Sequence, residues 1–283
     1  MKIDANSVTF EPQDMAFVKK FGILEATEMA LDYHAEHPNL PFLYDAEQLA
    51  GFLGISRGEL NDIVNHIQKE YKEAHLPKKD GTYRSLCVPS IRLRFCQDPI
   101  KEKILPQLPV SKFATAYQKG STTRGNAEPH IGKKFLLKLD ITDFFGSITF
   151  EQVQRTAFNT RYVSRQVGYL LTSLCCKDDS LPQGAATSPA LSNIVMYRFD
   201  DYIGRWCSQR QIAYTRYCDD MTFSANRPLY GVYQKVKTML REMGFELNES
   251  KTHFIGNDNR QSVTGLVVNE KLSIPSGYKR DLR

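Results

Sequence analysis

Two adjacent carboxylates are the first residues in this chain with an evident chemical use. Asp219 and Asp220 lie between two short runs, 212–217 and 221–224, that are rich in aromatic and β-branched residues. This pattern predicts a β-hairpin with both acids at its tip. The acids repel each other there, and a divalent cation would neutralise and orient them. A solvated turn, in which Asp is also common, is the alternative interpretation at this point.

A third carboxylate ends a second stretch of interest. Residues 135–139 form an apolar run broken only by Lys138, which is typical of a central strand, and Asp140 follows directly. Adjacent strand residues point to opposite faces of a sheet, so Asp219 and Asp220 reach one site only across a sharp turn. We therefore expect Asp140 and Asp219 to be the principal metal ligands, with Asp220 in support.

Three carboxylates around a cleft suit nucleotidyl transfer by a two-metal mechanism. In that chemistry, two Mg²⁺ ions hold the attacking and leaving oxygens of an in-line displacement. One ion lowers the pKa of a primer hydroxyl, and the other holds the triphosphate. If the three acids converge, two Mg²⁺ ions are the expected cofactors, with Mn²⁺ as a substitute.

Residues 76–89 predict a second β-hairpin, which carries cations. Its turn is an Asp-Gly pair, with Lys78 and Lys79 just before it and Arg84 on the returning strand. Cations on a projecting hairpin suit a triphosphate or a nucleic-acid backbone. A hairpin that is charged only for solubility is the alternative.

Two loops offer further contacts to phosphate or nucleotide. The loop at 116–127 is rich in Gly, Ser and Thr and carries Arg124, which suits contacts with phosphate. His130 follows, and a lone histidine at such a position is usually a hydrogen-bonded structural residue. In a later turn-rich loop, Gln183 and Gly184 place an amide side chain beside a bare backbone that a base or sugar could approach closely.

Helices are expected to position these stretches. Residues 1–70 are interpreted as helices joined by short loops, and residues 47–63 have the small and apolar positions of a helix-turn-helix. Acids on its second helix disfavour DNA reading, so we expect a packed helix pair there. Later helices are expected after Thr149, over 161–176, from Ser188 to about Cys207, and from 232 to a stop at Gly244.

Charge and cysteine usage restrict the partners and the location. The formal net charge is +5, but residues 1–60 carry ten acids against four bases, which leaves 22 acids and 33 bases in 61–283. A polyanionic partner therefore suits the later part, and the acidic start is a candidate dock for a protein. No apolar stretch is long enough to cross a bilayer, and the six cysteines form no CxxC pair. We expect a cytoplasmic protein with reduced thiols and no membrane contact.

Taken in order, these stretches resemble the motifs of reverse transcriptases, and in particular of bacterial retron reverse transcriptases. The resemblance runs from about Lys78 to Ile274. It rests on Asp140 with Phe144-Phe145, 181–184 with Ser188-Pro189, 217–220, and 248–252 with Lys251. Residues 126–130 match the retron NAxxH element, and 263–265 match the retron VTG element.

The resemblance implies a right-hand polymerase of the α+β class, with fingers and a palm whose antiparallel sheet is packed by helices. The expected divisions are 1–70 as the N-terminal helical region of the fingers, 71–135 as fingers with the β-hairpin, 136–275 as the catalytic palm, and 276–283 as the start of a thumb. Because the sequence stops soon after the VTG element, we expect the thumb to be truncated.

The resemblance also implies roles for named residues. The catalytic metal ligands would be Asp140, Asp219 and Asp220. The residues expected to bind dNTP are Lys78, Lys79, Arg84, Phe145, Gln183, Gly184 and Lys251. Those expected to bind nucleic acid are Arg124, Asn126, His130, Val263, Thr264 and Gly265. Phe145 matches a steric gate that selects deoxynucleotides, and Lys251 lies where the family carries a lysine near the leaving pyrophosphate.

The implied activity is that of an RNA-directed DNA polymerase. Retron members copy part of their own structured non-coding RNA from a 2′-hydroxyl primer, make branched multicopy single-stranded DNA, and serve in anti-phage defence with an effector protein. The alternatives are a group II intron or phage-exclusion type of reverse transcriptase, which the two retron elements disfavour. A catalytically idle nucleic-acid-binding scaffold is a further alternative, which the three acids disfavour.

Overall fold

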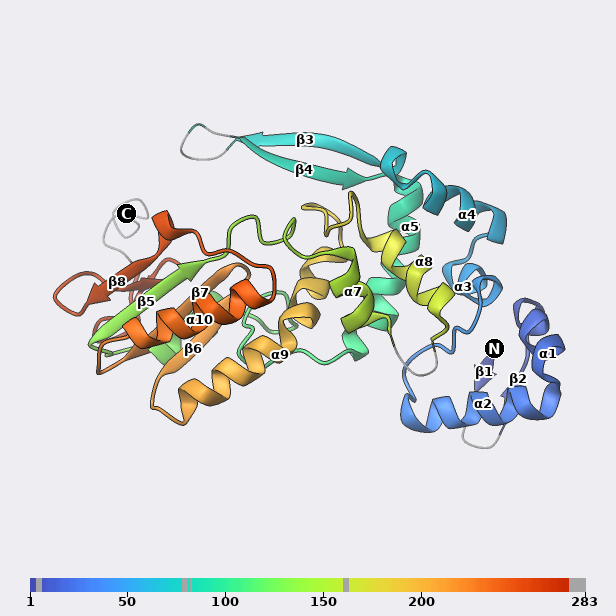
Figure 1. Cartoon of the computed structure of the whole chain (residues 1–283), viewed down its shortest axis with the longest axis horizontal. Helices are drawn as coiled ribbons and strands as arrows, with labels where there is room; N and C mark the ends of the chain where they lie inside the picture. Colours follow the sequence, from blue (N-terminus) through green and yellow to red (C-terminus); the bar gives the residue numbers. More distant parts are fainter. Residues whose placement is uncertain (4–6, 78–80, 82, 160–162, 275–283) are drawn as a thin grey trace. The chain divides into compact units, whose positions relative to one another are not determined.

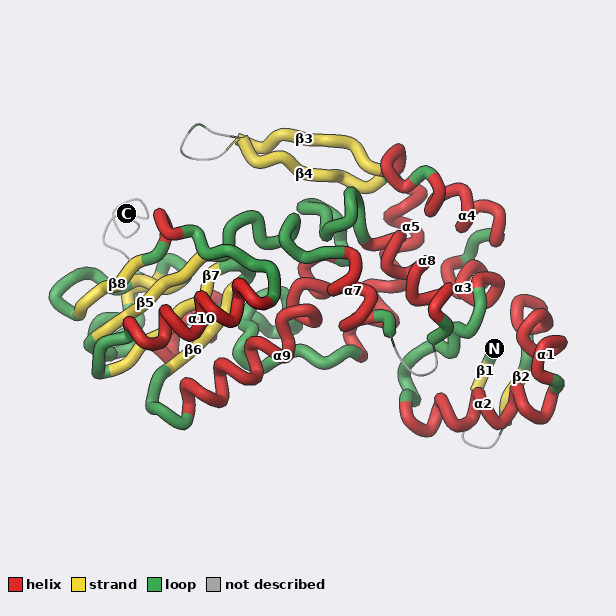
Figure 2. Tube along the Cα trace, viewed as in Figure 1, coloured by secondary structure: helices red, strands yellow, loops and turns green. Residues whose placement is uncertain are grey.

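The structure is a computed structural model, and it describes residues 1–3, 7–77, 81, 83–159 and 163–274. The chain forms two compact units, each built from two separate stretches. The first comprises Met1–Pro109 and Ile148–Val195, and the second Val110–Ser147 and Met196–Arg283. The divisions expected from the sequence are consecutive segments instead, and their assignment to fingers, palm and thumb stays a prediction. Figure 2 shows that helices dominate the first unit and that the larger sheet lies in the second.

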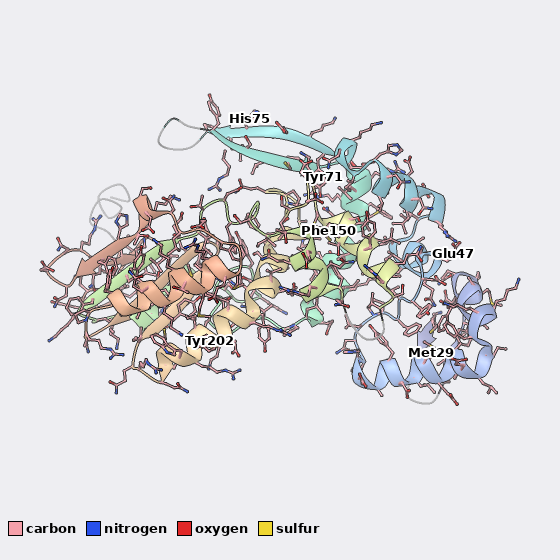
Figure 3. All side chains as sticks on the ribbon, viewed as in Figure 1. Met29, Glu47, Tyr71, His75, Phe150 and Tyr202 are labelled. Atoms are coloured by element: carbon pink, nitrogen blue, oxygen red, sulfur yellow. The ribbon has the colours of Figure 1, made fainter. Side chains whose placement is uncertain are left out.

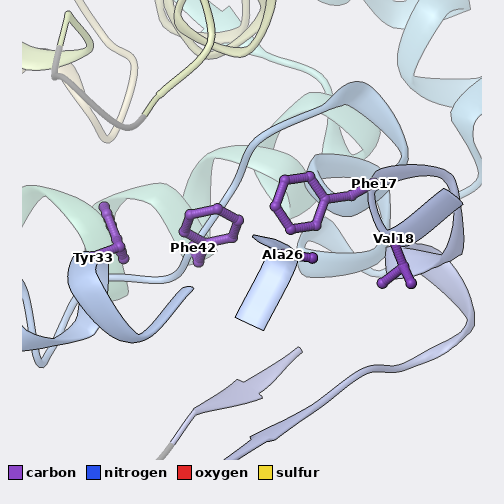
Figure 4. Close-up of a cluster of buried hydrophobic side chains, with 5 residues drawn as sticks. All are labelled: Phe17, Val18, Ala26, Tyr33 and Phe42. Carbon is purple, nitrogen blue, oxygen red and sulfur yellow. The ribbon is translucent and has the colours of Figure 1, made fainter. Parts of the chain in front are cut away.

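The first unit begins with two helices around an aromatic cluster. A short hairpin, β1 (Lys2–Ile3) with β2 (Val8–Thr9), and η1 (Pro12–Asp14) precede α1 (Met15–Phe21) and α2 (Ile23–Glu36). The apolar spacing from Lys19 to Tyr33 continues through both helices, but the chain breaks at Gly22, whose φ of 81° favours glycine. Figure 4 shows the buried side chains that join the two helices to the following loop: Phe17, Val18, Ala26, Tyr33 and Phe42.

The predicted packed helix pair is confirmed as α3 (Ala46–Leu53) and α4 (Arg57–Asn65). Both helices begin with a side-chain cap, because Asp45 accepts a hydrogen bond from Gln48 N and Ser56 forms a capping box with Glu59. Leucine and isoleucine side chains close the space between them at 0–2% exposure: Leu49, Leu53, Leu60 and Ile63. Apolar packing therefore accounts for the residue pattern that resembled a helix-turn-helix.

The predicted β-hairpin is confirmed as β3 (Tyr71–Pro77) paired with β4 (Tyr83–Pro89), after η2 (Ile67–Glu70). Lys78, Lys79 and the turn residue Asp80 lie outside the described residues. Figure 3 shows Tyr71 at the base of the hairpin and His75 further along β3. The Tyr71 hydroxyl accepts a hydrogen bond of 3.0 Å from Gln97, whose amide also donates to Leu174 O at 2.8 Å. One buried amide thus ties the base of the hairpin to two helices.

Several helices complete the first unit. They are α5 (Ile91–Pro99), the π-helix η3 (Ile100–Ile104), η4 (Leu105–Gln107), α7 (Phe150–Ala157), α8 (Arg165–Cys175) and the start of α9 (Ser188–Ser208). The expected capping box of Thr149 with Gln152 is present. The expectation that Ser188 caps α9 is wrong, since Ser188 lies inside the helix and its hydroxyl donates to Pro182 O. Across the described residues, no helix is both long and apolar enough for a membrane span.

The second unit contains the predicted antiparallel sheet. Its strands run in the order β6 (Ala213–Tyr217), β7 (Asp220–Ala225), β5 (Phe135–Asp140) and β8 (His253–Gly256). The expectation that residues 135–140 form a central strand is confirmed. Helix α10 (Tyr230–Glu242) lies along this sheet (Figure 1). The ring centroids of Tyr230 and Tyr233 lie 6.3 and 5.8 Å from that of Phe254 on β8.

Short elements connect the strands of the second unit. They are α6 (Thr123–Ala127), η5 (Glu128–His130), η6 (Glu249–Lys251), β9 (Ser262–Val263) and β10 (Leu266–Val267). An apolar cluster of Ala127, Leu136, Val263 and Val268 packs α6 and β9 against β5. This packing joins residues that precede the central strand to residues near the end of the described chain.

His130 is a buried structural residue between two strands. Its Nδ1 lies 2.7 Å from Ser224 Oγ on β7, and its Nε2 lies 2.9 Å from Thr215 Oγ1 on β6. The ring is 0% exposed, and burial, assisted by the charge of Lys133, lowers its pKa to about 3. The interpretation of this histidine as a hydrogen-bonded core residue is confirmed.

The low pKa of His130 predicts a loss of stability in mild acid. The unfolded state takes up a proton near pH 6.5 and the folded state does not, so stability is lost as the pH falls below 6.5. Between pH 7 and 5, His130 is expected to cost about 2 kcal/mol of unfolding free energy. Urea unfolding of the wild type and of His130→Gln measures it, since the variant lacks this part of the pH dependence. His253→Gln, which changes an exposed histidine at the start of β8, is the matched control for the loss of an imidazole.

Candidate active site

Asp219 and Asp220 lie at the tip of the β6–β7 hairpin, as predicted. Tyr217 pairs with Asp220, so Cys218 and Asp219 form a two-residue turn. Cys218 has a φ of 61°, a left-handed conformation that residues other than Gly and Asn rarely adopt. Such backbone strain persists only where the surroundings hold it, and it is frequent at functional sites.

The sheet brings the third carboxylate to the same place. Asp140, the last residue of β5, pairs directly with Asp220, the first residue of β7. Residues directly opposite each other on antiparallel strands project from the same face, with Cβ atoms about 5 Å apart. Ile141 N donates a hydrogen bond of 3.3 Å to Asp219 O, which holds the turn against the end of β5. The convergence expected from the sequence is therefore present in the backbone register.

Two lysines balance the charge of this cluster. Lys251 Nζ lies 2.9 and 3.0 Å from the two carboxylate oxygens of Asp140. That hydrogen bond, opposed by partial burial and assisted by the charges of all three aspartates, raises the pKa of Lys251. The pKa of Asp220 is also raised, first by burial and then by the Asp219 charge, while Lys138 counters the rise.

The donor set suits a divalent metal ion, although its geometry is not that of a formed site. Carboxylate oxygens are the hard ligands that Mg²⁺ prefers. Among the described residues, no three His, Cys, Asp or Glu side chains are arranged as metal ligands. The Lys251 ammonium instead neutralises Asp140. Metal binding by Asp140, Asp219 and Asp220 fits their chemistry and stays a prediction.

Phe145 lies in the same unit as the carboxylates, five residues after Asp140. The segment turns sharply at Asp143, whose φ is 42°. Phe144 is buried and Phe145 is half-buried, and their ring centroids lie 5.6 Å apart. A partly exposed ring on a short loop beyond the acidic cluster is compatible with the predicted steric gate.

Gln183 and Gly184 lie against the β3–β4 hairpin in the first unit. Cys87 N donates a hydrogen bond of 2.7 Å to Gln183 O. Gly184 has a φ of 126°, and a Cβ there would lie 2.8 Å from Cys87 O, so this close approach requires glycine. Arg84 is exposed on the same strand, β4. These residues belong to the first unit and the carboxylates to the second, so their joint action on one nucleotide stays a prediction.

The two retron elements meet inside the second unit, although they are 138 residues apart in sequence. The amide of Asn126 donates to Thr264 Oγ1 at 3.3 Å and accepts a hydrogen bond of 2.6 Å from Thr115. Asn126, His130 and Val263 are at most 1% exposed. Their burial argues against the expected direct contact of these three side chains with nucleic acid.

The remaining residues predicted to bind nucleic acid lie nearer the surface. Arg124 and Gly265 are exposed and Thr264 is half-buried. The guanidinium of Arg124 lies 3.7 Å from the Glu128 carboxylate, so a nearby acid already offsets part of its charge. Contacts of these three residues with RNA remain predictions.

Sequence reasoning missed a buried ion pair beside the β6–β7 hairpin. Arg216 on β6 is fully buried and bonds Asp200 on α9. The available signal was an arginine within an otherwise apolar and aromatic strand, directly before Tyr217. Such a charge is stable in a core only with a partner, and its sequence position does not reveal which acid that partner is.

The chain is similar to known reverse transcriptases over most of its length. The family model described as reverse transcriptase (RNA-dependent DNA polymerase) matches residues 76–268. Retron Ec86 reverse transcriptase of Escherichia coli is 29% identical over 92% of this chain and 82% of its own length. Retron Ec83 reverse transcriptase, also of E. coli, is 34% identical over 74% of this chain and 72% of its own. Retron Mx65 reverse transcriptase of Myxococcus xanthus is 32% identical, covering 86% and 62%.

A solved structure shares the fold at low sequence identity. Telomerase from Candida albicans, solved in complex with a fragment of telomeric RNA, superposes with a TM-score of 0.52 at 13% identity. The match covers 75% of this chain and 48% of the telomerase chain. It supports the α+β polymerase fold of fingers and palm. With the family match and the curated relatives, it leads to one conclusion: the chain belongs to the retron reverse transcriptases and is an RNA-directed DNA polymerase.

Proposed function

We propose that this reverse transcriptase copies part of a structured non-coding RNA partner from a 2′-hydroxyl of that RNA. The product would be branched multicopy single-stranded DNA, and an effector protein would join the complex in anti-phage defence. The observation that carries the proposal is the pairing of the two retron elements through Asn126 and Thr264 beside the acidic hairpin. The cytoplasm is the proposed location, in keeping with six free cysteines.

In the proposed reaction the acidic cluster supports attack on a dNTP. Asp140, Asp219 and Asp220 would hold divalent ions, Mg²⁺ by preference, which when bound activate the primer hydroxyl and bind the triphosphate. The primer hydroxyl gives its proton to water, and its oxygen bonds the α-phosphorus. The bond between that phosphorus and the α,β-bridging oxygen breaks, and pyrophosphate leaves with that electron pair. Lys251 already faces the cluster and supplies a cation next to the site where the pyrophosphate charge develops. Its side chain is 60% exposed and is therefore accessible to a ligand.

Phe145 would select the sugar of the incoming nucleotide. An aromatic ring close to the 2′ position excludes a hydroxyl by its bulk. Phe144, packed against Phe145 and Phe245, fixes the base of the loop that presents this ring. Gln183, Gly184 and Arg84, with Lys78 and Lys79, are the residues proposed to contact the base, sugar or phosphates of the dNTP.

Asp219→Asn is expected to abolish dNTP incorporation. The change keeps the shape of the side chain and removes the charge that binds a divalent cation, so primer extension on an RNA template should fall by at least about 100-fold. The affinity for RNA, measured by filter retention, should stay within about threefold of the wild type. Contacts between basic side chains and RNA phosphates supply most of that affinity. Asp201→Asn, which removes an ion pair with Arg205 on α9, is the matched control. Full activity of Asp219→Asn would refute the assignment.

Phe145→Ala is expected to relax sugar selection. Removal of the ring opens space for a 2′-hydroxyl, so the ratio of kcat/KM for dNTP over rNTP should drop by at least about tenfold. Single-nucleotide insertion with dGTP and GTP on one template measures this ratio within one protein sample. An unchanged ratio would exclude Phe145 as the gate.

The nucleic acid that co-purifies with the protein is expected to contain RNA joined to DNA by a 2′,5′ bond. The branch follows from priming on an RNA 2′-hydroxyl. Treatment with a debranching enzyme should release a linear DNA of defined length, resolved on a denaturing gel. Only linear DNA primed from a 3′ end would instead favour a group II intron type of reaction.

A further inference from the structure

Arg216 and Asp200 form a buried ion pair in the second unit. The Asp200 carboxylate accepts hydrogen bonds from Arg216 Nε at 3.0 and 3.1 Å and from Nη2 at 2.6 Å. The Tyr214 hydroxyl donates a further bond of 2.7 Å to the same carboxylate. Both charged side chains are 0% exposed. The pair therefore links α9 to β6 inside the core.

The same guanidinium reaches the turn that carries the catalytic acids. Its Nη1 donates a hydrogen bond of 2.8 Å to Cys218 O. Cys218 is the turn residue with a φ of 61°, and Asp219 and Asp220 follow it. The guanidinium carbon also lies 5.7 Å from the ring centroid of Phe144, the neighbour of Phe145. One side chain thus contacts both the acidic turn and the base of the predicted gate loop.

We propose that Arg216 is a positioning residue for polymerisation. It holds Cys218 in its left-handed conformation, so that Asp219 stays in the turn and Asp220 stays opposite Asp140. Its contact with Phe144 keeps the gate loop in register with this turn. The inference rests on the proposed roles of the aspartates and adds a residue that acts through them.

Stability alone does not account for this pair. Buried ion pairs often contribute no more to stability than well-packed apolar residues of similar volume, because desolvation offsets the attraction. An apolar core could therefore replace Asp200, Tyr214 and the guanidinium. It could not supply the hydrogen bond to Cys218 O, and a strained non-glycine residue needs surroundings that hold it.

Hydrogen bonds to Phe113 and Thr115 hold the backbone of Arg216. Arg216 N donates to Phe113 O at 2.8 Å, and Arg216 O accepts from Thr115 N at 2.7 Å. The Thr115 hydroxyl lies 3.0 Å from Arg216 O and 2.6 Å from Asn126 Oδ1. The Asn126 of the NAxxH element therefore supports the same residue whose side chain supports the turn.

The test is a triple variant in which Arg216→Met, Asp200→Leu and Tyr214→Phe together replace the polar cluster by apolar side chains. Phe at position 214 keeps the ring stack on Phe223. The thermal midpoint is expected to stay close to that of the wild type. In primer extension, kcat should fall at least about tenfold and the Mg²⁺ concentration for half-maximal rate should rise about fivefold, with KM for dNTP changed less than about threefold. Hydrogen exchange of the amides in residues 217–221 should accelerate.

Leu240→Ala is the matched control, since it leaves a cavity at a buried position of α10, an element other than those that carry the turn and the ion pair. This variant should have a lower thermal midpoint than the wild type. At temperatures below that midpoint, its kcat, its Mg²⁺ dependence and the exchange rate of residues 217–221 should equal those of the wild type. If the triple variant does not fold, Arg216→Lys carries the same test. Lysine keeps the charge, but it lacks the planar guanidinium that donates to the Asp200 carboxylate and to Cys218 O at the same time.

Wild-type kcat and Mg²⁺ dependence in the triple variant, or in Arg216→Lys where the triple variant does not fold, would overturn the proposal. Unchanged exchange at residues 217–221 would overturn it as well, because that measurement reports the turn without reference to catalysis. An inactive wild type, or an active Asp219→Asn, would instead refute the proposed function. The two failures are therefore distinguishable.

Discussion

Repulsion among three carboxylates is the constraint on which the rest of the second unit depends. The β5–β7 register places Asp140 opposite Asp220, and the two-residue turn adds Asp219. Such a cluster costs free energy in the absence of cations, and burial, followed by the charges of Asp219 and Asp140, raises the pKa of Asp220. The fold supplies the opposing stabilisation by packing the central strand on both sides and by placing Lys251 and Lys138 nearby. The end of the sheet keeps the three charges close together because the free energy gained by packing the core of the unit exceeds their repulsion.

Buried residues of the NAxxH element also hold the β6–β7 hairpin in place. His130 bonds Thr215 and Ser224, one residue on each strand of the acidic hairpin. Asn126 reaches the same hairpin through Thr115 and the backbone of Arg216. Both contacts are buried, so they brace the hairpin rather than read a nucleotide. A family signature can therefore reflect how the turn with Asp219 and Asp220 is held as much as what the family binds.

Local features of this fold were predictable, and long-range ones were not. Runs of aromatic and β-branched residues indicated the β6–β7 hairpin, and an Asp-Gly turn indicated the β3–β4 hairpin. An apolar run indicated β5, and Thr149 with Gln152 marked the start of α7. The sequence pattern does not mark the break between α1 and α2 at Gly22, because the apolar spacing continues through it. The bonds between Asn126 and Thr264 and between Arg216 and Asp200 depend on the packing of distant segments. Spacing along the chain does not encode such pairing. For the same reason, the sequence does not reveal which two stretches form each compact unit.

The Asp140–Lys251 contact shows which partner in the cluster can move. Asp140 ends a central strand and its side chain is 7% exposed, whereas the side chain of Lys251 is 60% exposed and follows the short η6 segment. An ion pair with one partner in solvent contributes only about 0–1 kcal/mol, because water screens it. That bond is too weak to keep the ammonium on Asp140 when a more highly charged group arrives. The aspartates are therefore the fixed part of this cluster, and we expect Lys251 to be the partner that moves if a phosphate binds beside them.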